Sequence, residues 1–425
     1  MPGIVTSQSP SYSLPMRYML TAVIAFGLFA LDLLVESVTL GKGVVFTPAV
    51  VALTHLLTIG VLLSFVMGAV YQLATVAFLI PIRFVSLARI NYWAYLVALI
   101  GLWVSMRTWW VTGLMIFGTL AVLSLYVYIA IVISSVAKSP VRGAMRGFVQ
   151  AAHIYLALAI TFAWLMILSF DKGVLASLMN EFLLTHILLA VSFFTFLIFG
   201  FTYKLLPMFT LSHGFATHRE KYTLILLHLT LWLLLAGVWL HVTALYVAGA
   251  LVGAAAFGLQ VFDMREMLKK RMRKRIEHPI RFVNLAPVLG GIVVLCIFAA
   301  LAVQQPTGKW QGLIAFYLLG WIVLTVMGYS YKIVPFLVWT KRFGKKVGRE
   351  KTPTIAELLN LEKSAWMFWV FLLGLVVSVF SLGFEMIPGA ILGAALVAAA
   401  IVQYVMHMFH VLDLSKLPRE LTHDD

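Results

Sequence analysis

The sequence predicts an all-α, polytopic membrane protein with twelve transmembrane helices in three pseudo-repeated four-helix units and with both termini in the cytoplasm. The first observation is composition: 62% of the 425 residues are hydrophobic, only 11% are charged, and the mean hydropathy is +1.01. A water-soluble domain needs more polar surface than this composition supplies. The second observation is the number and length of the apolar segments, and the third is an internal repeat.

Twelve segments are long and apolar enough to span a bilayer, because a spanning helix needs about 20 apolar residues. They cover residues 17–36, 48–80, 91–106, 108–136, 149–170, 178–208, 222–240, 242–268, 281–303, 309–337, 362–383 and 387–411. The loops between them are short, so residues 1–425 are expected to form a single membrane domain. The single cysteine, Cys296, excludes an internal disulfide and a thiolate cluster.

The basic residues predict the orientation. If the N-terminus is cytoplasmic, the outward loops hold only Lys42, Arg107, Lys172 and Lys309, and the other Lys and Arg residues face inward. This asymmetry is the positive-inside rule. It predicts a multi-pass protein of the plasma (inner) membrane, and it attributes the net charge of +15 to topology and lipid-bilayer contact. We expect no nucleic-acid partner.

A short motif recurs near the end of the second, sixth and tenth segments. Gly68, Gly200 and Gly328 align, and each is followed three residues later by a tyrosine, Tyr71, Tyr203 or Tyr331. The period is four helices, which predicts parallel repeat units at 1–140, 141–280 and 281–425. We expect each tyrosine to anchor its helix end in the membrane interface. A polar pathway from the cytoplasm is the alternative interpretation.

Three histidines are expected in the outer half of the membrane. His55 and His186 lie near the outward starts of the second and sixth helices, and His241 lies at the outward end of the seventh. Ionisable groups within a bilayer are costly and are therefore functional candidates. Neutral imidazole is a common ligand for haem iron and copper. We predict that the three residues converge and bind a metal or haem; the alternative is that each only bonds a neighbouring helix.

Secondary candidates lie toward the cytoplasmic side. His407 and His410 are three residues apart and share a helical face with Asp413, which is a possible metal-binding arrangement or simply a solvated helix end. His153 and His228 are further functional candidates at this depth.

The architecture and these residues resemble subunit I of the haem-copper oxidases, the catalytic subunit of cytochrome oxidases and nitric oxide reductases. The resemblance implies that His55, on the second helix, binds haem and that His186, on the sixth, binds copper. The family places a histidine pair at the outer end of the seventh helix, where this chain has only His241, followed by Val242. The family also has two haem histidines on the tenth helix, and this chain has none there.

The resemblance therefore implies a protein that binds haem, copper or both in a respiratory or nitric-oxide-related membrane system, without an intact oxygen-reducing centre. Standard cytochrome oxidase activity is not expected. One alternative function is a membrane transporter or assembly factor for haem, copper or a small molecule. A structural partner of other respiratory or assembly membrane subunits is a second alternative.

Overall fold

The computed structural model describes residues 11–216, 218–302, 310–344, 346, 349–355, 357–359, 361 and 364–412, and it contains twelve helices long and apolar enough to cross a membrane. The prediction of twelve spans is confirmed. The first span, predicted at 17–36, is longer in the structure and runs from Ser13 to Gly41. The residues so described form no β-strand, in keeping with the need of a lipid-exposed backbone to pair all its polar groups internally.

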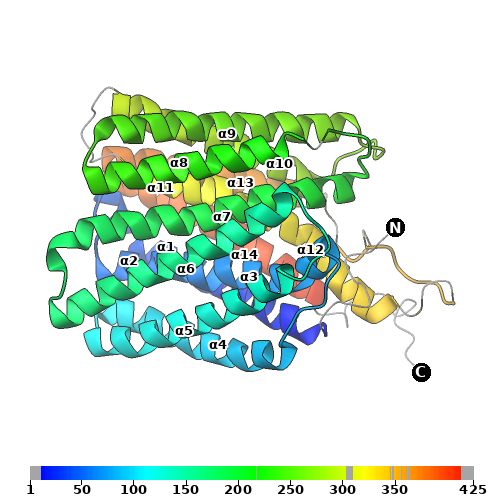
Figure 1. Cartoon of the computed structure of the whole chain (residues 1–425), viewed down its shortest axis with the longest axis horizontal. Helices are drawn as coiled ribbons and strands as arrows, with labels where there is room; N and C mark the ends of the chain where they lie inside the picture. The colour runs from blue at the N-terminus through cyan, green and yellow to red at the C-terminus, as the bar shows by residue number, and fades with distance from the viewer. Residues whose placement is uncertain are drawn as a thin grey trace.

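The helices, in chain order, are α1 (Ser13–Gly41), α2 (Pro48–His55), η1 (Leu56–Leu63), α3 (Ser64–Ala77), α4 (Val85–Thr108), α5 (Val111–Val136), α6 (Ala144–Lys172), η2 (Ala176–Leu178), α7 (Met179–Thr210), α8 (Glu220–Leu240), α9 (Thr243–Lys269), α10 (His278–Ala302), α11 (Trp310–Phe316), η4 (Tyr317–Val323), α12 (Leu324–Phe343), α13 (Ser364–Phe384) and α14 (Ile387–Leu412). The second span is α2–η1–α3 and the tenth is α11–η4–α12. All spans lie roughly parallel to one axis (Figure 1).

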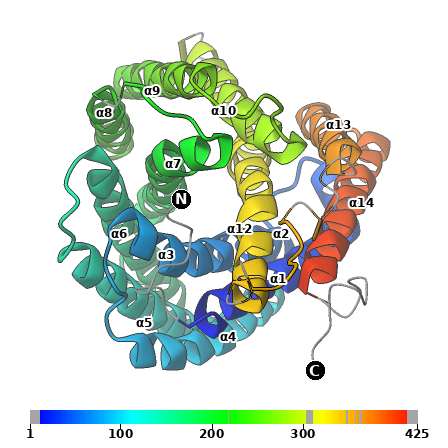
Figure 2. The same cartoon turned by 90° about the vertical axis from the view of Figure 1, so that its right-hand side faces the viewer.

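Nine of the described spans form a closed ring, and the other three lie inside it. The ring runs through α1, α4, α5, α6, α8, α9, α10, α13 and α14, and α14 returns to α1. Figure 2 shows α3, α7 and α12 within this ring. α1 begins and α14 ends at the same end of the bundle. The loops at this end are rich in Lys and Arg, so we call it the basic end and the other the opposite end.

The three aligned glycines mark close crossings between inner and ring helices. A Cβ atom added at Gly68 would lie 2.6 Å from the backbone oxygen of Pro15 in α1. One added at Gly200 would lie 2.6 Å from a Phe side chain of α6. At Gly328 the obstacles are a valine and a backbone oxygen of α10, at 2.5 and 2.8 Å. Small residues permit such backbone approach, and van der Waals contact then holds helices together in lipid.

Two of the inner spans contain a π-helical segment. η1 directly follows His55, and η4 occupies the corresponding part of the tenth span. The wider turn of η1 leaves the Ile59 carbonyl accessible, and the Tyr95 hydroxyl donates to it at 2.7 Å while also contacting the Ser64 hydroxyl at 2.8 Å. Short π-helical turns occur mostly as insertions into α-helices and are frequent at functional sites.

We predict that Gly68→Ala destabilises the protein, although replacing glycine by alanine inside a helix ordinarily stabilises by about 1 kcal/mol. The Pro15 backbone cannot move aside like a flexible side chain, so we expect a net loss of about 2 kcal/mol. Thermal unfolding in detergent measures it. Gly258→Ala is the matched control, because a Cβ there meets no atom within 4 Å. Equal unfolding temperatures for the two variants would contradict the close crossing.

Candidate functional site

His55 and His186 lie side by side in the structure. Their ring centroids are 6.3 Å apart, and the ring planes differ by only 9°. Each histidine is the eighth residue of its helix, counted from Pro48 in α2 and Met179 in α7, and so lies about 10 Å from the helix start. Both side chains are half-buried near the opposite end of the bundle.

The hydrogen bonds of the two rings fix their tautomers. The Nδ1 atom of His55 is 2.8 Å from the carbonyl oxygen of Val51, and the Nδ1 atom of His186 is 2.9 Å from that of Ala159 in α6. A carbonyl oxygen only accepts, so in each ring Nδ1 carries the proton and donates it. Nε2 then carries a lone pair, and no hydrogen bond within the described residues engages it. A bond from Nδ1–H to a backbone carbonyl is the arrangement that orients many metal-binding histidines.

The separation of the rings fits a metal ion held between them. Each metal–nitrogen bond is about 2.0 Å and each nitrogen lies about 1 Å from its ring centroid, so a bridged pair has centroids roughly 6 Å apart. The ring centroids of His55 and His186 are at this separation, and the ring planes are parallel to within 9°. Neutral imidazole suits copper, iron and zinc. Within the described residues no third His, Cys, Asp or Glu completes a larger cluster.

His241 does not join this pair, so the expected convergence of three histidines is wrong. It is the residue that ends α8, it has the left-handed backbone conformation (φ 55°), and its side chain is 72% exposed. Its Nε2 atom lies 3.4 Å from the Glu181 carboxylate at the start of α7. The turn between α8 and α9 therefore directs the ring toward the surface of the bundle.

The inner histidines are bonded to tyrosines. His153 is fully buried: its Nδ1 donates to the Val149 carbonyl at 2.7 Å, and its Nε2 accepts from the Tyr128 hydroxyl at 3.1 Å. The Nδ1 atom of His228 lies 2.5 Å from the Tyr155 hydroxyl and shares a hydrogen bond with it. Both nitrogens of His153 are thus used by protein partners, which supports its alternative interpretation as a core hydrogen-bonding residue.

The two histidines predicted to share a face of α14 lie in different environments. His407 contacts the Tyr331 hydroxyl through Nδ1 at 2.7 Å, whereas His410 is exposed. Asp413 lies outside the described residues. Within the part of α14 that the structure describes, His407 and His410 belong to no cluster of three metal-binding side chains.

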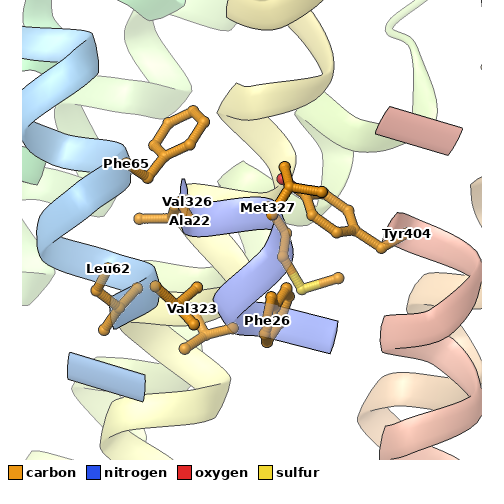
Figure 3. Close-up of a pocket in the computed structure, with 10 residues that line it drawn as sticks. Ala22, Phe26, Leu62, Phe65, Val323, Val326, Met327 and Tyr404 are labelled. Atoms are coloured by element: carbon orange, nitrogen blue, oxygen red, sulfur yellow. The ribbon is translucent and has the colours of Figure 1, made fainter. Parts of the chain in front are cut away.

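The space between the second and tenth spans is filled by side chains. A small cavity of about 10 Å³, roughly the size of one water molecule, lies between them. Figure 3 shows the residues around it. They come from α1, the second span, the tenth span and α14: Ala22, Val23, Phe26, Val61, Leu62, Phe65, Val323, Val326, Met327 and Tyr404. A haem held between these two spans does not fit this packing.

The aligned tyrosines are buried inside the bundle, so their expected place in the membrane interface is wrong. The Tyr203 hydroxyl donates to Asp263 of α9 at 2.9 Å, and Tyr331 bonds His407 of α14. Tyr71 packs against Tyr128 of α5 with ring centroids 5.5 Å apart. Each inner helix points this tyrosine at a ring helix, because the whole helix end is enclosed by protein and not by lipid headgroups.

Sequence reasoning missed an ion cluster near the opposite end. Arg107, in the last turn of α4, bonds Asp32 at 2.5 Å and Glu36 at 3.2 Å, both from α1. The side chains of Asp32 and Glu36 are only 8% and 9% exposed. Their spacing of four residues placed them on one helical face, which was the available signal. Their partner, Arg107, could not be predicted, because the sequence does not show that α1 and α4 are neighbours in the ring.

The chain matches no protein-family model and no curated protein.

We predict that Arg107→Gln destabilises the protein by roughly 2 kcal/mol, because it leaves two carboxylates buried without a cation; the partial exposure of Arg107 reduces the cost below that of a fully buried pair. Thermal unfolding in detergent measures the change. The control is Lys172→Gln, which breaks an exposed ion pair with Asp171 and should change stability little. Equal effects of both variants would show that the buried pair needs no cation.

Proposed function

We propose that this chain is an integral membrane protein of the haem-copper oxidase subunit I type, which binds one metal ion between His55 and His186. The observation that carries the proposal is the pair of near-parallel imidazoles with centroids 6.3 Å apart and with both Nδ1 atoms already bonded to carbonyls. His55 and His186 are the two residues that the family resemblance assigns to haem and to copper, so here the two assignments merge into one site.

Copper fits this donor set best. Two neutral nitrogen ligands suit Cu(I), which accepts two-coordinate binding, whereas a closed zinc site usually takes four ligands. Among the described residues no carboxylate joins the two histidines in a cluster. When bound, copper would supply one-electron chemistry. The protein's part is to orient the rings: the Val51 and Ala159 carbonyls hold both imidazoles in the tautomer that presents Nε2.

Haem iron is the second candidate, because His55 and His186 would hold it through the same ring nitrogens. It would require a flat space for the macrocycle beside the pair. The tenth span adds no histidine, and its face toward the second span is packed with Val323, Val326 and Met327. Oxygen reduction at a haem-copper pair is therefore not part of the proposal.

The positions of the three aligned glycines support a threefold internal repeat, which the family assignment implies. Gly68, Gly200 and Gly328 each face the first helix of their own unit, α1, α6 or α10. Gly68 follows the end of η1 by five residues, and Gly328 follows the end of η4 by the same number. We propose that residues 1–140, 141–280 and 281–425 are parallel repeats about a pseudo-threefold axis, each contributing one inner helix.

We propose that the basic end is cytoplasmic and that the protein lies in the plasma (inner) membrane. The loops that join α9 to α10 and α5 to α6 lie at the basic end and are rich in Lys and Arg. The histidine pair would then lie in the outer half of the bilayer.

We expect purified protein reconstituted with Cu(I) to retain stoichiometric copper, and both His55→Ala and His186→Ala to lose most of it, since a two-ligand site has no redundancy. Metal analysis after gel filtration measures this, and a Soret band in the visible spectrum reports haem instead. His241→Ala is the matched control and should keep the metal. Wild-type protein that holds neither copper nor haem would overturn the proposal and favour a transporter or a structural subunit.

Orientation is tested by cysteine labelling in intact cells. In a Cys296→Ser background, we expect an impermeant maleimide to label Lys172→Cys but not Arg271→Cys, because the two positions lie at opposite ends of the bundle. Permeabilised cells provide the control and should label both. Labelling of Arg271→Cys alone in intact cells would reverse the proposed topology.

A further inference from the structure

The loop between α9 and α10 is held against the end of α7. Residues Ser212 and Arg271 form an isolated antiparallel bridge. The backbone N–H of Met272 donates to the Leu211 carbonyl at 3.2 Å, and that of Arg273 donates to the Thr210 carbonyl at 3.4 Å. The loop is therefore a defined surface at the basic end, beside the lipid-facing side of α9.

This loop carries a large excess of positive charge. Between residues 266 and 281 there are seven Lys or Arg residues and two Glu residues. All seven cations are exposed: Lys269, Lys270, Arg271, Arg273, Lys274, Arg275 and Arg281. Glu266 is bonded by Lys269 at 2.6 Å, and Glu277 is held by Arg273 at 2.8 Å and by Lys332 of α12. The two carboxylates are thus neutralised locally, and the remaining surface is cationic.

A shallow hollow of about 10 Å³ lies between the loop and the end of α7, and its walls are partly apolar, so a headgroup would lie on this surface and not inside it. It is lined by Phe209, Thr210, Arg273, Arg275, Ile276, Glu277 and Ile280. Met272, in the middle of the basic run, is 71% exposed, and Phe262 on α9 is exposed as well. Cations and apolar side chains therefore alternate where the bundle leaves the bilayer. A ligand for this surface must combine a negative headgroup with hydrocarbon.

We propose that this loop and the end of α7 form a binding site for the phosphate headgroup of an anionic glycerophospholipid, with its acyl chains along α9. Basic pockets on the cytoplasmic side of membrane helices recognise such headgroups, and each cation near the surface contributes roughly a fivefold gain in affinity. The exposed cations of the loop supply hydrogen-bond donors and charge, while Met272 and Phe262 supply apolar contact. The proposal is independent of the metal site.

The test is a titration of the purified protein, in neutral detergent micelles, with phosphatidylglycerol, with phosphatidylcholine or with inorganic phosphate, read out as lipid retained in native mass spectra and as thermal stabilisation. We expect phosphatidylglycerol to bind and stabilise at a lower fraction than phosphatidylcholine. The triple variant Arg271→Gln, Lys274→Gln, Arg275→Gln should need at least about tenfold more phosphatidylglycerol for the same effect.

The matched control removes the same charge at the same end of the bundle, through Arg83→Gln, Lys138→Gln and Arg142→Gln, and it should bind as the wild type does. If both triple variants lost the same affinity for phosphatidylglycerol, binding would depend only on the general surface charge, and the proposed site would be overturned. Stabilisation by inorganic phosphate equal to that by phosphatidylglycerol would assign the site to free phosphate and overturn the lipid assignment. An unchanged unfolding temperature without lipid confirms that the variants are folded, and their lipid titrations then decide the outcome.

Discussion

The lack of hydrogen-bonding partners in the bilayer core governs this structure. Hydrogen bonds within the protein stabilise polar side chains inside the ring, because hydrocarbon offers them no partner. Tyr203 therefore pairs with Asp263, Tyr331 with His407, and Tyr128 with His153. These contacts join inner helices to ring helices, or neighbouring ring helices to each other. They add specific registration to a packing that otherwise depends on small residues and van der Waals contact.

Against this background, the histidine pair differs from His153. His153 uses both ring nitrogens for protein partners, so its bonding is complete. His55 and His186 use one nitrogen each, they share the same tautomer, and their ring planes are nearly parallel. A π-helical turn directly follows His55 and widens the helix beside the pair.

The charged side chains at the two ends of the bundle are stabilised in different ways. At the opposite end, Asp32 and Glu36 are buried and need Arg107 within hydrogen-bonding distance. At the basic end, the cations of the α9–α10 loop are exposed and outnumber the carboxylates that neutralise them. Buried charge is therefore paired within the protein, whereas surplus charge lies where water and lipid headgroups can solvate it.

The sequence by itself determined the helical class, the number of spans and the residues that became the candidate site, because hydrophobic length and helix-end counting are local properties of a chain in lipid. It placed His55 and His186 at equal depth. Only the tertiary structure decided that these two rings meet and that His241 turns away to Glu181, since lateral position depends on which helices pack together. The same reason explains Tyr71, Tyr203 and Tyr331. The sequence predicted their depth in the membrane but not the ring of helices around them, and because of this ring the three side chains are buried and not at the membrane interface.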